Sequence, residues 1–199
     1  FTREKLAGYR DRMYRPDCGV LAVAGNYDLN QLTALAEKYL GAWPKGSGPC
    51  PSLTLAPPKP TLIRREKDIE QLHICLSYPG YGQGGDEVYP LTIFSSAFGG
   101  AMSSRLFQKI REERGMAYTV YSYPSFFMGT GTLAVYAGTS KQHAPEVLRL
   151  FAEEAARAIE GGLTREEFEK TRTQLKGSYV LGQESASARM NCRKNEATR

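Results

Sequence analysis

The chain has 199 residues, of which 41% are hydrophobic and 24% are charged, and its formal net charge is +5. This length and composition are those of a globular protein with one well-buried domain, or with one domain and part of a second. No apolar run approaches the ~18 residues of a membrane span, and the basic residues are scattered among acidic ones, so we expect neither a membrane nor a nucleic-acid partner.

Residues 1–43 predict a helix–strand–helix unit. We expect a helix over residues 2–14 that Thr2 can cap, and the apolar run 18–25 has the length of a buried strand. Asp28 and Gln31 form a capping-box pattern that opens a second helix. Because the chain begins without Met or a signal-peptide pattern, we interpret it as a piece of a longer protein.

Residues 44–60 are rich in proline and glycine, which excludes a helix or a central strand there. We therefore predict a stiff, extended linker and a domain boundary. Beyond it, residues 61–68 and 70–78 are expected to form two strands. A glycine-rich loop then leads to a helix that we expect Asp86 to cap and that should extend to about residue 97.

The rest of the chain is predicted to alternate strands in hairpins with paired helices. The predicted elements are a helix over about 103–113, strands over 118–127 and 131–139, and helices over 144–160, 164–182 and 185–198. Thr164 and Glu167 supply a capping box for one of these helices. This order indicates an α+β fold, in which helices pack on one face of a mostly antiparallel sheet.

The usual hydrolytic motifs are absent from the sequence. His73 and His143 belong to no HxxEH or related pattern, and no serine lies in a G-x-S-x-G elbow. The four cysteines are far apart without a CxxC pair, so we expect free thiols in a reducing compartment, the cytoplasm. We expect the chain to supply no metal ligand and no catalytic residue of its own.

The candidate site lies in residues 98–118. Gly99 and Gly100 open a loop that lacks both the P-loop and the G-x-G-x-x-G spacing, which disfavours a phosphate cradle. The remaining interpretations are a tight turn between packed helices, or a place where another peptide backbone approaches closely.

Arg111 and Tyr118 are the other two candidate residues in this stretch. An arginine offers a fixed fork of donors, and a tyrosine hydroxyl donates one directed hydrogen bond. Converging on one carbonyl, the two side chains would fix a peptide and stabilise a developing oxyanion. Alternatively, Arg111 pairs with a neighbouring glutamate and Tyr118 packs in the sheet. The spacing alone does not choose between these interpretations.

A family resemblance covers nearly the whole chain. Residues 99–122, GGAMSSRLFQKIREERGMAYTVYS, closely resemble the non-zinc half of the pitrilysin/insulinase family of zinc metallopeptidases. The similarity is strongest to bacterial members that resemble the mitochondrial processing peptidase. Residues 14–28 are similar to the family's Y-x-P-x-N-x-x-L-x-V-x-G-x-x-D segment, with Cys18 where Asn is usual, and residues 70–74 and 175–190 also fit.

The resemblance implies a clamshell of two similar halves around a chamber. One half carries HxxEH and a downstream Glu around zinc, and the other contributes an Arg and a Tyr, which fall on Arg111 and Tyr118. Residues 1–43 then resemble the closing unit of the first half, and residues 61–199 the second half without its own closing unit. We add the hypothesis that 1–43 complete the sheet of 61–199, in cis or by exchange with a neighbouring copy.

The expected function is that of the substrate-enclosing, non-zinc half of a zinc endopeptidase, inactive as a fragment. Arg111, Tyr118, Gly99 and Gly100 are the expected peptide contacts, and zinc is expected in the full-length protein only. The expected partners are a peptide, the zinc-bearing half or a partner subunit, and a second copy in a homodimer. The alternative is a non-catalytic subunit that lends the Arg–Tyr pair to a separate zinc-bearing chain. The intact pair argues against a purely structural homologue.

Overall fold

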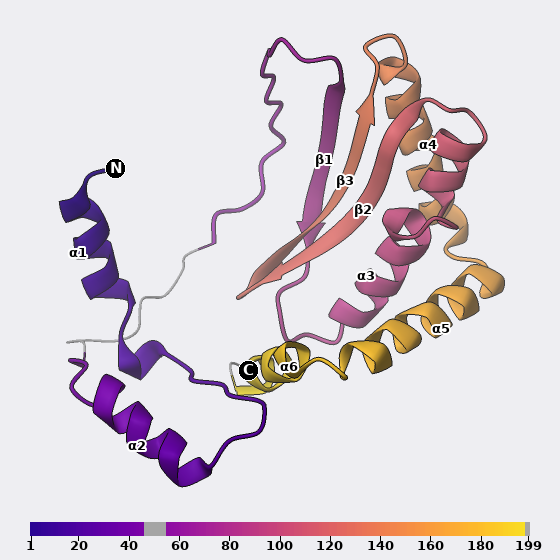
Figure 1. The fold of residues 1–199 in the computed structure, drawn as a ribbon. Coiled ribbons are helices and arrows are strands. Elements are labelled where there is room, and N and C mark those ends of the chain that lie inside the picture. The colour runs from indigo at the N-terminus through magenta and orange to yellow at the C-terminus, as the bar shows by residue number, and fades with distance from the viewer. Residues whose placement is uncertain (46–54, 198–199) are drawn as a thin grey trace. The chain divides into compact units, whose positions relative to one another are not determined.

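The computed structural model describes residues 1–45 and 55–197 of the chain (Figure 1). The central part of the predicted linker, residues 46–54, lies outside the described residues. Contacts divide the chain into two compact units, one made of Phe1–Thr54 with Ser178–Arg199 and the other of Leu55–Gly177. In the described part of the chain, no helix combines the length and the apolar character that crossing a bilayer requires.

The first unit contains helices α1 (Arg3–Met13), α2 (Leu29–Leu40) and α6 (Ala186–Ala197). The Thr2 hydroxyl accepts a hydrogen bond from the Lys5 N–H and caps α1. Asp28 Oδ1 accepts a hydrogen bond of 2.8 Å from the N–H of Gln31 and opens α2. The starts of both helices are therefore those that the sequence predicts, because a cap is formed by residues close together in the chain.

The second unit is built on a three-stranded antiparallel sheet with the strand order β1-β3-β2. Its strands are β1 (Leu72–Gly80), β2 (Ala117–Phe127) and β3 (Thr130–Thr139). β2 and β3 form the predicted hairpin, in which Gly129 has a φ of 73°, a conformation that glycine adopts without strain. Since β3 pairs on both sides, β1 and β2 are the edge strands of the described sheet.

The helices of the second unit are α3 (Val88–Ser95), α4 (Ala144–Gly161) and α5 (Arg165–Gly182), the last of which leaves this unit after Gly177. Two short π-helices, η2 (Ser96–Gly100) and η3 (Phe107–Glu112), lie between α3 and β2 in the sequence. Figure 1 shows α3 and α4 on the same side of the sheet. The α+β architecture predicted from the sequence is confirmed.

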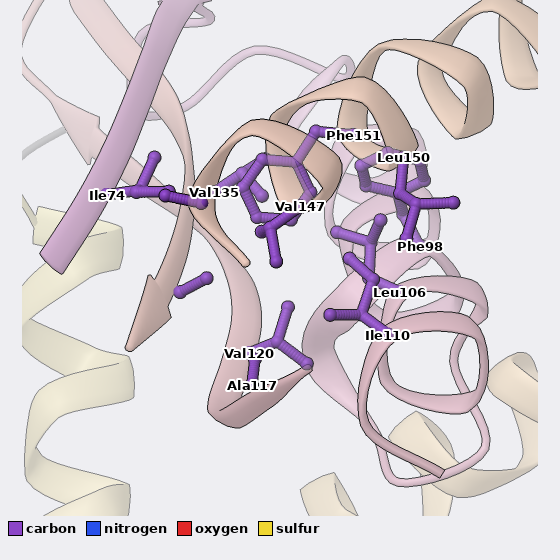
Figure 2. Packing of buried hydrophobic residues seen from close by; sticks show 12 residues of the cluster. Ile74, Phe98, Leu106, Ile110, Ala117, Val120, Val135, Val147, Leu150 and Phe151 are labelled. Atoms are coloured by element: carbon purple, nitrogen blue, oxygen red, sulfur yellow. The ribbon is translucent and has the colours of Figure 1, made fainter. Parts of the chain in front are cut away.

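The core lies between one face of the sheet and these helices (Figure 2). Ile74, Val120 and Val135 supply one buried side chain from each strand. The helical side chains that meet them include Phe98, Leu106, Ile110, Val147, Leu150 and Phe151. Burial of each large apolar side chain stabilises the fold by about 1.5–3 kcal/mol. This core therefore holds η3, the short helix that carries Arg111, against the sheet.

Two predicted strands are absent from the structure. Residues 18–25 form no strand, and Val20 and Leu21 are 49% and 63% exposed. Residues 61–68 are likewise irregular and exposed. A strand needs a neighbour for its N–H and C=O groups, and the described sheet offers neither segment a paired strand. Whether residues 1–43 complete the sheet of the second unit, in cis or by exchange with a neighbouring copy, stays a prediction.

Two helix predictions also need correction. The helix that Asp86 was expected to cap, with an end near residue 97, spans Val88–Ser95. Its N-cap residue is Glu87, whose side chain makes no capping hydrogen bond. The helix expected over 103–113 is α-helical only at its start and continues as η3. The π-type winding depends on how the segment packs, which local sequence patterns do not report.

Candidate functional site

Arg111 is carried by η3 and lies against the ring of Phe107, four residues earlier. The Arg111 guanidinium carbon is 4.9 Å from the centroid of that ring, while Ile110 is buried in the core. The helix ends at Gly115, whose φ of 60° lets the chain turn towards β2. The burial of Ile110 therefore fixes the backbone position of Arg111 on η3, and the ring of Phe107 supports the Arg111 side chain.

Tyr118 lies at an irregularity near the start of β2. Ala117 pairs with Thr139 and Thr119 pairs with Gly138, so Tyr118 is an extra residue that the partner strand does not match. Such a bulge takes a residue out of the strict alternation of the strand and changes the direction of its side chain. The Tyr118 side chain is 74% exposed. The interpretation in which Tyr118 packs within the sheet is therefore wrong.

The structure brings Arg111 and Tyr118 together. The guanidinium carbon of Arg111 lies 5.8 Å from the centroid of the Tyr118 ring. Cation–π contacts at exposed sites contribute about 0.5–1 kcal/mol each and restrict the positions of the guanidinium. Within the described residues Arg111 forms no ion pair, and Glu113 binds Lys109 at 2.8 Å instead. The donors of Arg111 are therefore not neutralised by the neighbouring glutamates.

Gly99 and Gly100 end η2, and they differ in what surrounds them. A Cβ atom on Gly99 would lie 2.6 Å from the backbone nitrogen of Ser122 on β2, which is closer than side-chain carbons approach. The Ser122 hydroxyl donates a hydrogen bond of 2.8 Å to the Ser95 carbonyl and fastens the same contact. Gly99 is buried and Gly100 is exposed. The geometry favours a close approach of two backbones, and at Gly99 the second backbone belongs to β2 of this chain.

Arg105 fixes the start of the helix that carries Arg111. Its Nε and Nη2 atoms donate to Glu167 Oε1 and Oε2 at 2.6 Å and 2.7 Å, and Nη2 also donates to the Gly162 carbonyl at 2.8 Å. Glu167 also forms the predicted capping box, since its backbone N–H donates to Thr164 Oγ1 and its carboxylate accepts from the Thr164 N–H. The hydrogen bonds from Arg105 are the main reason why the pKa of Glu167 falls to about 2.

An aromatic patch, defined by His73, Tyr121, Tyr123 and Tyr136, lies on the sheet face opposite the core. These residues alternate with the core residues Ile74, Val120 and Val135, so their side chains leave the other face. The ring centroids of Tyr121 and Tyr136 are 4.9 Å apart, and those of Tyr121 and Tyr123 are 5.7 Å apart. Sequence reasoning missed this patch, although Tyr121 and Tyr123 alternate with buried residues in a predicted strand.

The described residues do not fit a zinc site. Among them, no group of three or more His, Cys, Asp or Glu side chains is placed to hold a metal ion. The Nδ1 atom of His73 forms a hydrogen bond of 2.7 Å with the Tyr136 hydroxyl, as expected for a structural histidine. His143 lies beside Gln142, and the Nε2 atom of His143 is 3.2 Å from the side-chain amide nitrogen of Gln142.

Comparison with known proteins identifies the family. Residues 1–175 match the family described as "Peptidase M16 inactive domain". The chain belongs to this family. The resemblance to pitrilysin/insulinase-type zinc metallopeptidases is thereby confirmed, and it places this M16 inactive domain in a peptidase context.

A curated relative supports this assignment, and two solved structures share the fold. This chain is 34% identical over 191 residues to "Uncharacterized zinc protease YmxG" of Bacillus subtilis. The match covers 96% of this chain and 46% of that relative. The chain thus spans about half the length of the curated relatives that it matches. A protease from Helicobacter pylori has a similar fold, with a TM-score of 0.80 at 17% identity over 94% of this chain and 47% of that chain. So does the M16 inactive domain from Pseudomonas fluorescens, with a TM-score of 0.78 at 23% identity over 89% and 43%.

Proposed function

We propose that this chain forms the substrate-enclosing, non-zinc half of a zinc-dependent endopeptidase, in which Arg111 and Tyr118 hold a peptide carbonyl. The proposal rests on one observation, the exposed guanidinium of Arg111 held over the ring of Tyr118 without an ion pair to any described residue. The family and the relatives named zinc proteases support a peptidase context.

The proposed role follows from the chemistry of the two donors. The guanidinium of Arg111 offers a fixed fork of donors, and the Tyr118 hydroxyl adds one directed hydrogen bond. Both interactions strengthen as negative charge develops on a carbonyl oxygen, so they favour the transition state over the bound substrate. The rings of Phe107 and Tyr118 restrict the guanidinium beforehand, which lowers the loss of side-chain freedom on binding.

In this proposal the zinc is bound outside the chain, because the described residues do not fit a metal site. The contribution of this chain is to bind and orient the peptide, and we expect it to be inactive by itself. The alternative is a non-catalytic subunit whose pair serves a separate zinc-bearing chain. An HxxEH motif in the remainder of the full-length protein would favour the first arrangement, and its absence there would favour the second.

The proposal is tested in the full-length protein by Arg111→Ala and Tyr118→Phe. We expect kcat/KM for a peptide to fall by about 10²- to 10³-fold for Arg111→Ala, the usual effect of losing an oxyanion donor. Tyr118→Phe should lower it by about tenfold or more, since it removes the hydroxyl and keeps the ring. Zinc content, measured by atomic absorption, should not change.

Tyr89 supplies the matched control for the tyrosine variant. It lies on α3 with a side chain that is 61% exposed, so Tyr89→Phe removes a comparable hydroxyl away from the pair. We expect its kcat/KM to equal that of the wild type. Unaltered kinetics in both Arg111→Ala and Tyr118→Phe would contradict the proposal.

A further inference from the structure

Phe107 and Arg111 both lie on η3, whose π-type winding is frequent at functional sites. The guanidinium carbon of Arg111 is 4.9 Å from the centroid of the Phe107 ring and 5.8 Å from that of the Tyr118 ring. Both distances fall within the ~6 Å over which a ring attracts a cation. The guanidinium therefore has two aromatic neighbours, and the nearer one belongs to its own helix.

The two rings differ in how firmly they are held. Phe107 is partly buried and packs against the hydrophobic core, whereas Tyr118 is 74% exposed at the bulge of β2. A ring that packs in a core has lost its rotamer freedom on folding, and an exposed ring keeps more of it. The core of the second unit therefore orders Arg111 chiefly through Phe107.

The charged side chains near Arg111 are engaged with other partners. Glu113 accepts a hydrogen bond of 2.8 Å from Lys109 Nζ. Arg114 donates one of 2.7 Å to Glu146 on α4. A contact through the face of a ring uses none of the N–H donors of a guanidinium. The two rings thus hold Arg111 while its donors stay available for a carbonyl.

We propose that Phe107 is a positioning residue for Arg111. Its ring, fixed by the core, holds the guanidinium where it meets the peptide carbonyl, and Phe107 itself does not touch the peptide. The role requires the ring and not only its bulk, since an aliphatic side chain can pack in the core but does not attract a cation. This inference rests on the proposed function, and it goes further by assigning a role to a residue outside the Arg–Tyr pair.

Phe107→Leu tests the role of the ring in the full-length, zinc-loaded protein. Leucine keeps an apolar side chain in the core and removes the ring face. We expect kcat for a peptide to fall about two- to fivefold, the factor that one exposed cation–π contact provides, and KM to change less. Phe107→Tyr keeps the ring and should retain the wild-type kcat.

The same substitution in the Arg111→Ala background separates positioning from direct contact. A residue that acts only through Arg111 has nothing left to position there, so Phe107→Leu should cause no further loss of kcat. Phe94 supplies the matched control, since it is also partly buried against the core and its ring lies 5.2 Å from that of Phe98. Phe94→Leu should leave kcat unchanged. A further loss in Arg111→Ala, or equal losses in both leucine variants, would overturn the inference.

The order of the guanidinium is measured without any substrate. Nitrogen-15 NMR relaxation of the Arg111 Nε–H group, assigned by its disappearance in Arg111→Ala, gives its order parameter. We expect a lower value in Phe107→Leu than in the wild type, and the wild-type value in Phe107→Tyr. An unchanged order parameter in folded Phe107→Leu would overturn the inference.

Phe107→Met replaces the leucine variant should circular dichroism show that Phe107→Leu is unfolded, because methionine also fills a core without a ring. The proposed function fails separately, through unaltered cleavage in Arg111→Ala and Tyr118→Phe. The relaxation measurement does not require cleavage, so it reports on Phe107 in either case.

Discussion

Replacing Gly99 with alanine would place a methyl carbon 2.6 Å from the Ser122 backbone nitrogen and 2.8 Å from its hydroxyl. Both atoms belong to β2, so η2 or the strand must move. We expect Gly99→Ala to lower the free energy of unfolding by about 1–3 kcal/mol, as over-packing usually does. Urea denaturation of the full-length protein, followed by circular dichroism, measures the change.

Gly100 is the neighbouring control for this prediction. A Cβ atom there would meet the Ser95 carbonyl oxygen at 3.3 Å, and the residue is exposed. Gly100→Ala should change the free energy of unfolding by less than about 1 kcal/mol. Equal effects of the two substitutions would show that the contact between Gly99 and β2 does not constrain the fold.

Single residues also show how far the sequence could predict the site. The residue types of Arg111 and Tyr118 and their place at a helix–strand junction could be read from the chain. Their proximity could not, because it depends on the π-helical winding of η3 and on the bulge at Tyr118. Both features arise from packing against other elements. The untested part is the contact with a peptide, which stays a prediction for all four proposed site residues.

At the scale of elements, Glu167 links the start of α5 to Arg105 ahead of η3. Its carboxylate has a pKa lowered from the usual 4.5 to about 2, chiefly by hydrogen bonds from Arg105. The stabilisation is therefore complete above about pH 4.5 and is lost as the pH falls towards 2. At pH 7 we expect Glu167→Gln to lower the free energy of unfolding by about 2 kcal/mol, because it weakens a half-buried bidentate pair.

The pH dependence distinguishes this pair from a general effect of substitution. Denaturation curves of wild type and Glu167→Gln should approach each other as the pH falls from about 4.5 to 2 and below, since Glu167 then becomes protonated and resembles Gln in charge. Glu166→Gln, an exposed neighbour in the first turn of α5, should match the wild type throughout. A stability difference that stays constant with pH would exclude the proposed role of the Glu167 charge.

Whether a predicted helix cap or strand forms depends on how far along the chain its hydrogen-bond partners lie. The caps at Thr2, Asp28 and Thr164 involve neighbours in the chain, and all three form as expected. The β2–β3 hairpin is also local, and it forms with a two-residue loop. Residues 18–25 have an apolar run typical of a buried strand, and residues 61–68 are likewise expected to form a strand. A strand also requires a paired neighbour, which the local sequence does not supply.

At the scale of the whole molecule, the chain spans about half the length of the curated relatives that it matches. We propose the peptidase activity for the longer protein. Zinc and peptide would meet between this chain and residues outside it. The described residues supply the open donors of Arg111 and Tyr118, without a place for the metal. The central claim is therefore that the Arg–Tyr pair acts as one unit on a peptide carbonyl.

A double-mutant cycle of cleavage by the full-length protein tests this claim most directly. It compares kcat/KM of the wild type, Arg111→Ala, Tyr118→Phe and the double variant on one peptide, with zinc content held equal. If both donors serve the same oxygen, the double variant should lose much less than the product of the two single effects, because groups that act together are not additive. Wild-type kcat/KM in all three variants, or losses that simply multiply, would contradict the account.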